Sequence, residues 1–196
     1  MANVFDVVAY ITQQAGAVDR LKLQKLVYYA QGWSLAWDGA PLFRERIEAW
    51  RAGPVVRDLW AAQNHDHPRT GDPARLTEPE RATLDEVLRF YGARDGAWLS
   101  ELSHREDPWI EARGALPSGA ASQNPVTLES LQKYFAPQAA VMGTRRLTDA
   151  LARGLDLIMS LPEDEQPPLF AMSSVSGDEE IAFLEGRGPD PWASAS

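Results

Sequence analysis

The chain has 196 residues, of which 44% are hydrophobic and 24% are charged, a composition that is typical of a globular protein and excludes a fibrous or wholly disordered chain. Zero cysteines exclude disulfide scaffolds, thiolate nucleophiles and cysteine-ligated metals, and the lack of a long apolar stretch or a signal-peptide pattern predicts a cytoplasmic protein without a membrane partner. The formal net charge of −9 provides no concentrated positive field for phosphate groups, which disfavours nucleic acid as a partner and favours a basic protein.

Two helices are expected at the start of the chain. Asn3 is placed to cap the first, whose apolar residues follow helical spacing up to a stop at Gly16. Asp19 can cap the second, which ends near Asp38-Gly39 and carries an apolar stripe along one side. The stripe consists of Leu23, Leu26, Val27, Ala30 and Trp37.

The segment after the second helix has no clean periodicity. We interpret Arg46–Arg51 as a short strand or extended piece that ends at Gly53-Pro54. Proline is favoured in the first turn of a helix because it has no amide hydrogen to leave unpaired. The sequence therefore predicts a helix that starts at Pro54 and carries Val55, Val56, Leu59 and Trp60.

Further helices are expected between residues 77 and 113, after a polar, turn-rich loop over residues 64–73. Thr77 and Glu80 match a capping box before a helix that stops at Gly92. Asp95 can cap a short helix over residues 96–103, and Pro108 opens another that runs to residue 113.

The C-terminal third divides into a helical part and an acidic part. Thr127 can cap a helix over residues 128–135, and after a break at Pro137 a longer helix is expected to end before Pro162. From residue 163 onward, proline, glycine, serine and acidic residues dominate, and such a composition cannot offset its ordering entropy by burial. We therefore predict a mainly α fold: a compact multi-helix domain over 1–136 with at most a short strand pair, a C-terminal helix over 137–162 that packs on it or extends it, and an acidic, flexible tail over 163–196.

The tail holds most of the net charge. Residues 163–196 contain eight acidic residues and one arginine, a charge of −7, which leaves −2 of the total −9 for residues 1–162. Two apolar clusters interrupt the tail, Leu169-Phe170 with Met172, and Ile181 with Phe183-Leu184. They are either docking motifs or segments that pack on the body.

Residues that could carry chemistry are few. Only His65-Asp66-His67 has the spacing of metal ligands, and no nearby histidine or cysteine completes a tetrahedral zinc set, so we expect no metal site. His104 could act as an acid or base, but bridging backbone groups is the simpler role for a single histidine beside a helix end. Nucleophile-elbow, phosphate-loop and dinucleotide motifs are absent, so we expect neither a cofactor nor enzymatic activity.

Six of the seven tryptophans lie between residues 33 and 109. Large aromatic rings either build a core or serve as binding hot spots, in which tryptophan, tyrosine and arginine dominate. The sequence leaves both uses open for Trp33, Trp37, Trp50, Trp60, Trp98 and Trp109.

Several residues of these elements occur in an order that is typical of one family. The matching segments are Lys22–Gly32, Pro41–Phe43, Glu48–Trp50, Gly53–Val55, Leu102–His104 and Pro108-Trp109. Over about residues 5–135 the chain resembles the Panacea, or SocA-like, antitoxin domain.

The resemblance implies an antitoxin that neutralises a cognate toxin by direct binding. One relative in this family is an adaptor that hands its toxin to a ClpXP-type protease, so the resemblance includes this role as a second possibility. It implies no catalysis. By position it marks six candidates for partner binding, namely Lys22, Lys25, Tyr28, Trp50, His104 and Trp109. Three further residues are expected to be structural, namely Gly53, Pro54 and Pro108.

Two other functional classes stay open. Short helices with Lys22 and Lys25, which could face phosphates, suit a DNA-binding transcriptional regulator, against which the acidic charge argues. A hydrolase would use His104 with a nearby acidic residue, and this single histidine is its only motivation. The expected partners are a toxin and, for an adaptor, an AAA+ protease of the bacterial cytoplasm, and the sequence does not determine the oligomeric state.

Overall fold

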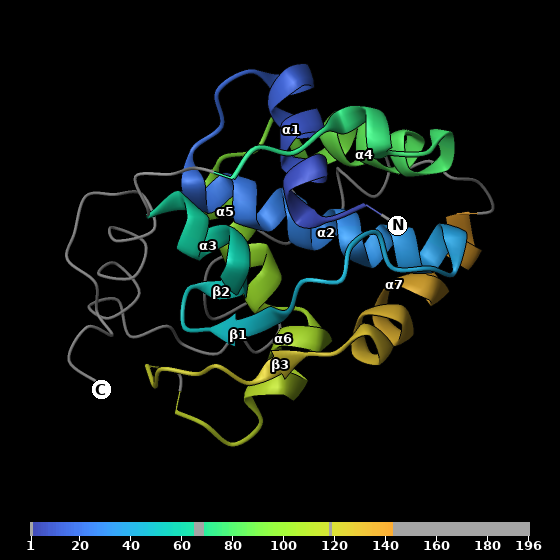
Figure 1. Cartoon of the computed structure of the whole chain (residues 1–196). Coiled ribbons are helices and arrows are strands. Elements are labelled where there is room, and N and C mark those ends of the chain that lie inside the picture. Colours follow the sequence, from blue (N-terminus) through green and yellow to red (C-terminus); the bar gives the residue numbers. More distant parts are fainter. Residues whose placement is uncertain (1, 65–68, 118, 143–196) are drawn as a thin grey trace.

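The computed structural model describes residues 2–64, 69–117 and 119–142 (Figure 1). They form seven α-helices, one 3₁₀ turn and a small sheet, so the predicted mainly α fold is confirmed. The elements are α1 (Val4–Ala15), α2 (Arg20–Asp38), β1 (Ile47–Trp50), β2 (Gly53–Val56), α3 (Arg57–Gln63), η1 (Pro73–Arg75), α4 (Glu78–Tyr91), α5 (Gly96–His104), α6 (Asp107–Arg113), β3 (Pro125–Val126) and α7 (Leu128–Met142). The histidine pair at 65 and 67, the helix predicted beyond residue 142 and the acidic tail lie outside the described residues.

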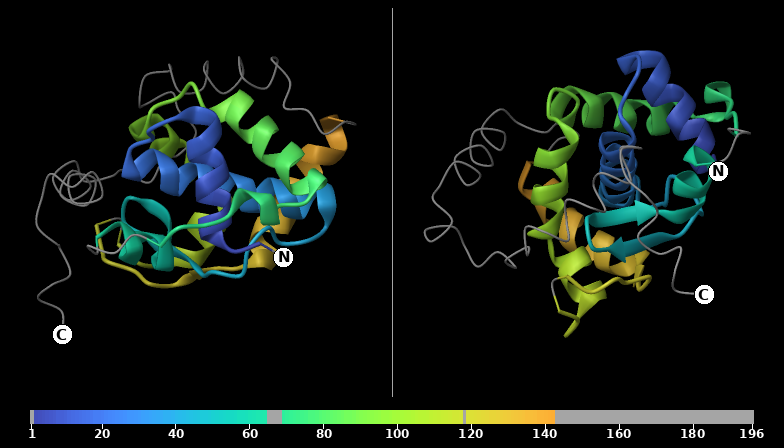
Figure 2. Two further views of the ribbon diagram at one scale, coloured as in Figure 1. Left: turned by 45° about the horizontal axis from the view of Figure 1, so that its top comes forward. Right: turned by 90° about the vertical axis from the view of Figure 1, so that its left-hand side faces the viewer.

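Helix α2 is the central element of the fold, and its predicted limits are confirmed. The carboxylate of Asp19 accepts the amide of Lys22 over 2.8 Å, and Gly39 ends the helix in the left-handed region with φ of 65°. Helices α1, α4, α5 and α7 all pack against α2 (Figures 1 and 2). Because 14 of its 19 residues are buried, α2 is enclosed on every side rather than amphipathic.

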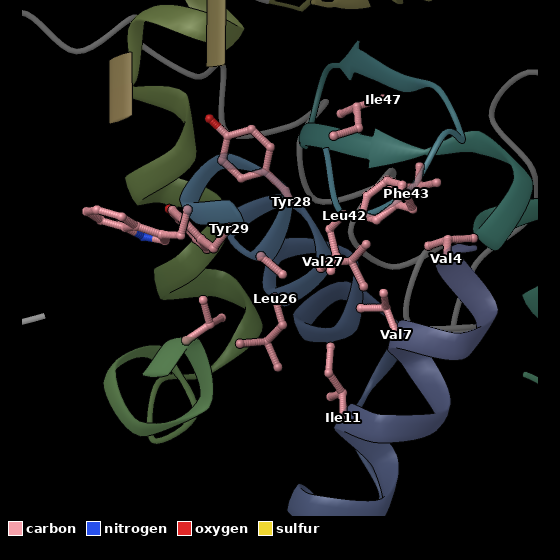
Figure 3. Close-up of a cluster of buried hydrophobic side chains, with 14 of the residues drawn as sticks. Val4, Val7, Ile11, Leu26, Val27, Tyr28, Tyr29, Leu42, Phe43 and Ile47 are labelled. Atoms are coloured by element: carbon pink, nitrogen blue, oxygen red, sulfur yellow. The ribbon is translucent and has the colours of Figure 1, made fainter. Parts of the chain in front are cut away.

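The main core lies between α1, α2 and the segment that leads into the sheet. Figure 3 shows Val7 and Ile11 of α1 facing Val27 of α2, with Leu42 and Phe43 beside them. All five side chains are buried, and each contributes about 1.5–3 kcal/mol by leaving water. Among the described helices, none is long and apolar enough to cross a membrane.

The three helices predicted between residues 77 and 113 are confirmed with small shifts. The amide of Thr77 donates to Glu80 over 2.7 Å at the start of α4, as the capping box requires. Asp95 caps α5 through the amide of Trp98 at 2.8 Å. Helix α6 begins at Asp107 and has Pro108 in its first turn, where a missing amide hydrogen costs no hydrogen bond.

Strands β1 and β2 form an antiparallel hairpin in which Ile47 pairs with Val56 and Trp50 pairs with Gly53. The extended segment predicted over residues 46–51 is confirmed, but the helix predicted from Pro54 is wrong. Residues 53–56 are a strand, and the helix begins only at Arg57. Contacts with α2 explain the difference, because the amide of Val56 donates to Gln24 over 2.8 Å.

The third strand, β3, pairs with β1 on the side opposite β2 and extends the sheet beyond the expected strand pair. Helix α7 follows and continues through Pro137, where the sequence predicted a break. Pro137 lies on the exposed side of α7, so water can bond the carbonyl that loses its amide donor. The inner side carries Phe135, which packs over Gly32 of α2.

Gly32→Ala should lower the free energy of unfolding by about 1–2 kcal/mol, because overpacking costs about 1–3 kcal/mol and exceeds the helix propensity gained with alanine. A Cβ atom at Gly32 would lie 2.4 Å from the ring of Phe135. That ring cannot move freely, since its edge-to-face neighbours include Tyr28 and Trp33. Urea unfolding measures the loss. Adding Phe135→Leu to the variant should recover part of it, and purely additive losses would contradict the clash.

Candidate functional site: a hairpin held by buried side chains

The turn of the β1–β2 hairpin is held from inside by side chains of three helices. From α6, the indole Nε1 of Trp109 donates to the carbonyl of Trp50 over 2.8 Å. From the end of α5, Nε2 of His104 lies 2.9 Å from the carbonyl of Arg51. The rings of His104 and Trp109 meet edge to face with centroids 4.4 Å apart, so the two donors also support each other.

The third helix, α2, contributes Lys25, which is fully buried. Its ammonium donates to the carbonyl of Ala52 over 2.6 Å and to that of Pro54 over 3.2 Å. The carbonyl of Ala52 also accepts the hydroxyl of Ser100 over 2.7 Å. Because an ammonium without partners in the protein interior is very costly, these bonds make Lys25 and the hairpin turn depend on each other.

Gly53 provides the space that this arrangement needs. Its φ of +100° is a conformation that side chains disfavour. A Cβ atom there would lie 2.5 Å from the ammonium of Lys25 and 2.8 Å from the hydroxyl of Ser103. The glycine predicted to be structural is therefore required both by the backbone and by the buried lysine.

The outer edge of β2 is closed by α2. The amide of Val56 donates to the side chain of Gln24, and the ammonium of Lys25 donates to the carbonyl of Pro54. Pro54 itself has no amide hydrogen that could donate to another strand. An edge strand with its polar groups satisfied cannot extend its sheet with a strand from another chain. Partner binding by strand addition is thereby disfavoured at this edge.

Arg113 holds the far side of the hairpin. Its guanidinium donates to the carbonyl of Ala49 over 3.3 Å and to those of Pro117 and Ala120 over 2.9 and 2.7 Å. It also stacks over the ring of Trp109 at 5.0 Å. We call Lys25, Ser100, His104, Trp109 and Arg113 together the hairpin cradle.

His104 is neutral within the cradle. Burial and, to a lesser extent, the nearby charge of Lys25 together lower the pKa of its imidazole from 6.5 to about 3. Because a carbonyl can only accept, the neutral ring must carry its proton on Nε2 and donate it to Arg51. The bridging role expected for this residue is what the geometry shows.

A second buried polar pair lies beside the cradle. The hydroxyl of Tyr28 donates to the carboxyl group of Glu106 over 2.7 Å, and both residues are buried. Burial raises the pKa of Glu106 from 4.5 to about 8, which the bond from Tyr28 only partly opposes. Glu106 is therefore mostly protonated at neutral pH.

Five of the six candidates for partner binding lie in the interior, with exposed fractions of 4% or less: Lys25, Tyr28, Trp50, His104 and Trp109. Lys22 is half-buried and donates to the carbonyl of Gly92 over 2.7 Å, next to the end of α4. The structure thus brings Lys25, Trp50, His104 and Trp109 together around the hairpin, whereas Tyr28 belongs to the neighbouring pair. Contact with a partner stays a prediction for all six.

These positions weaken the evidence for the two other classes. Lys22 and Lys25 use their ammonium groups on backbone carbonyls inside the molecule, so neither faces phosphates as a DNA-binding regulator would need. His104 is enclosed and bonded to the backbone, which leaves it no access to a substrate. Among the residues that the structure describes, no group of three or more metal-ligating side chains occurs.

Several members of the site were not singled out from the sequence. They are Gln24, Gln31, Ser100, Glu106 and Arg113. The two glutamines carry a detectable signal, since they lie seven positions apart, about two helical turns, on either side of the hydrophobic stretch Leu26–Ala30. The side-chain oxygen of Gln31 accepts hydrogen bonds from the backbone amides of Leu42 and Phe43 over 2.9 and 3.1 Å.

Comparison with known families covers this site. Residues 23–110 match the family model described as "Antitoxin SocA-like, Panacea domain". This segment carries the match to the Panacea domain. The antitoxin family that it matches points to a role in a toxin–antitoxin system. The comparisons found no match among curated proteins or solved structures.

The matched range covers most of the site but is shorter than the folded unit. It contains the hairpin and four of the five cradle residues, of which only Arg113 lies beyond residue 110. Strand β3 and helix α7 follow the matched range, yet β3 completes the sheet and α7 packs along α2. The folded unit therefore extends past the Panacea match to the end of α7.

Proposed function

We propose that this chain is an antitoxin that neutralises a cognate toxin by direct binding in the bacterial cytoplasm. The observation that carries the proposal is the match to the Panacea domain over residues 23–110. The buried cradle supports a binding role, because its polar side chains bond to the backbone of the hairpin and hold it in place. The protein acts by binding and not by catalysis.

The contact surface that we propose is the hairpin face, which consists of Arg46, Arg57 and Trp60 over a floor of Trp50 and Val55. Arg46 is exposed, the side chain of Arg57 is 53% exposed, and Trp60 is partly exposed. Tryptophan and arginine on a rigid support are typical of binding hot spots. A held hairpin also loses little conformational freedom on binding, which favours affinity.

Coexpression with the toxin encoded next to this chain tests the proposal. Cells should tolerate the toxin only when the intact chain is present, and Arg46→Glu with Arg57→Glu should reduce complex formation at least tenfold. The matched control is Arg75→Glu with Lys133→Glu, which makes the same charge change at two exposed sites away from the hairpin. Equal growth with and without the chain would refute the antitoxin role, and equal effects of both pairs would refute this contact surface.

Neutralisation could proceed by sequestration alone or by delivery to a ClpXP-type protease. The acidic tail outside the Panacea match is the segment that we assign to protease recruitment in the second case. Toxin half-life separates the two modes, because delivery shortens it and sequestration does not. A half-life that is unchanged by the chain excludes the adaptor.

A further inference from the structure

A small apolar cluster reaches the surface at the hairpin face. Side chains alternate along the strands, so Ile47 and Val56 join the main core while Trp50 and Val55 point the other way into this separate cluster. Trp60 of α3 packs edge to face on Trp50 with centroids 4.9 Å apart and is itself partly exposed. In the right-hand view of Figure 2 the hairpin lies below α2, which is seen end-on.

Positive charge surrounds this cluster. Arg46 directly precedes β1 and Arg57 directly follows β2, and since Ile47 pairs with Val56, both arginines lie at the same end of the hairpin. Over residues 41–57 four arginines outnumber two glutamates, an excess of +2, whereas residues 1–162 as a whole carry −2.

Of the two glutamates of this stretch, Glu48 forms an ion pair with Arg57 and offsets part of its charge, and the excess of +2 already includes both glutamates. Glu48 is buried, where its carboxylate accepts the indole Nε1 of Trp50 over 2.8 Å, and it lies 3.7 Å from Arg57. Glu45 accepts the amide of Val4 over 3.1 Å at the start of α1. The one exposed acid beside the cluster is Asp58, the second residue of α3.

The C-terminal tail has the complementary chemistry. Residues 163–196 carry −7 and contain two short apolar clusters, at 169–172 and 181–184. As the predicted helix, the 20 residues that join Met142 to residue 163 would span about 30 Å, and the 34 residues of the tail add to this reach. A body of this size has a radius of gyration of about 15 Å, so every face lies within reach of the tail.

We propose that the acidic tail docks on the hairpin face of its own chain and competes with the partner for that surface. Its carboxylates lie against Arg46 and Arg57, and one of its apolar clusters covers Trp60. A tethered segment has an effective concentration of about 1 mM, so even weak docking occupies the site until a tighter ligand displaces it. The competition depends on the proposed function, but the docking itself does not.

Paramagnetic relaxation in the full-length chain tests the docking without any toxin. Because the chain has no cysteine, Ser176→Cys accepts a single spin label between the two apolar clusters. The label should broaden the indole signal of Trp60 and the amide signals of Val55 and Arg57, and leave the amides of Thr12 and Ala82 unchanged.

Charge reversal provides the control. Arg46→Glu with Arg57→Glu should abolish the broadening, while Arg75→Glu with Lys133→Glu should preserve it. A mixture of labelled chain with isotope-enriched, unlabelled chain should show none, because the contact is intramolecular. Uniform or absent broadening, broadening that survives reversal at the hairpin face, or broadening in the mixture would each overturn the proposal.

Removal of tail charge measures the competition. Glu179→Gln with Glu180→Gln should strengthen toxin binding about threefold to tenfold by weakening the internal competitor, and an unchanged or weaker affinity would contradict competition. If the toxin does not bind the chain at all, the proposed function fails while the relaxation experiment still decides whether the tail docks.

Discussion

Replacement of Lys25 by methionine should lower the free energy of unfolding by about 3–5 kcal/mol, because a hydrogen bond to a charged group contributes about 1.5–3 kcal/mol and Lys25 makes two of them. The methionine would fill the volume but donate no hydrogen bond. The carbonyl of Pro54 would lose the bond that Lys25 provides, and that of Ala52 would keep only the hydroxyl of Ser100. The hairpin turn would then be the first part of the fold to open.

Lys22→Met is the matched control, since it removes the same charge from the same helix three residues earlier. Lys22 is half-buried and makes one bond, to the carbonyl of Gly92, so its loss should cost about 1 kcal/mol. Denaturant unfolding followed by tryptophan fluorescence gives both values. Similar losses for the two variants would show that the burial of Lys25 has no special energetic role.

The second large effect is a two-sided dependence of stability on pH. The pKa of Glu106 is 4.5 unfolded and about 8 folded, so between these values unfolding releases a proton and stability falls as pH rises. The pKa of His104 is 6.5 unfolded and about 3 folded, so between these values unfolding takes up a proton and stability falls as pH drops. From pH 4.5 to 6.5 the two contributions cancel.

Each group contributes a slope of about 1.4 kcal/mol per pH unit within its own range. From pH 6.5 to 8, ionisation of Glu106 should therefore remove about 2 kcal/mol. Glu106→Gln keeps a group that can accept the hydroxyl of Tyr28 but cannot ionise, so its stability should rise from pH 4.5 to 6.5 and then stay level.

The difference between the variant and the wild type isolates this carboxyl group, because all other titrations cancel. Thermal or urea unfolding at half-unit steps of pH measures it. The corresponding variant His104→Gln should lose the acid side of the profile and keep the alkaline side. A difference curve for Glu106→Gln that does not change with pH would show that Glu106 titrates alike in the folded and unfolded chain.

These two tests concern the scaffold, whereas the proposed interactions concern its outer surface. The cradle residues lie inside and the hairpin face lies outside, with the hairpin backbone between them. A variant of Lys25 should therefore weaken partner binding only through loss of structure, while a variant of Arg57 should weaken it in a chain of normal stability. Measuring stability and binding on the same variants separates the two effects.

The family pattern could be recognised from the sequence, but its meaning could not. Lys25, His104 and Trp109 were predicted as partner contacts because they hold positions that the family resemblance marks, although a bridge between backbone groups was the simpler role expected for His104. In the folded chain they are interior donors to Ala52, Arg51 and Trp50. Their acceptors are backbone carbonyls, which leave no trace in the residue types of the sequence.

What the sequence determined by itself are the helix limits at Asn3, Asp19, Gly39 and Thr77, because a cap is a bond between residues at most four positions apart. Only the tertiary structure decided that residues 53–56 form a strand, since their partners on α2 lie about 30 positions away, at Gln24 and Lys25. The cradle could not be predicted for the same reason, because its side chains lie 27 to 64 positions away in sequence from the hairpin carbonyl groups that they bond. Short-range preferences define elements, whereas burial and long-range hydrogen bonds decide which of two locally acceptable structures the hairpin adopts.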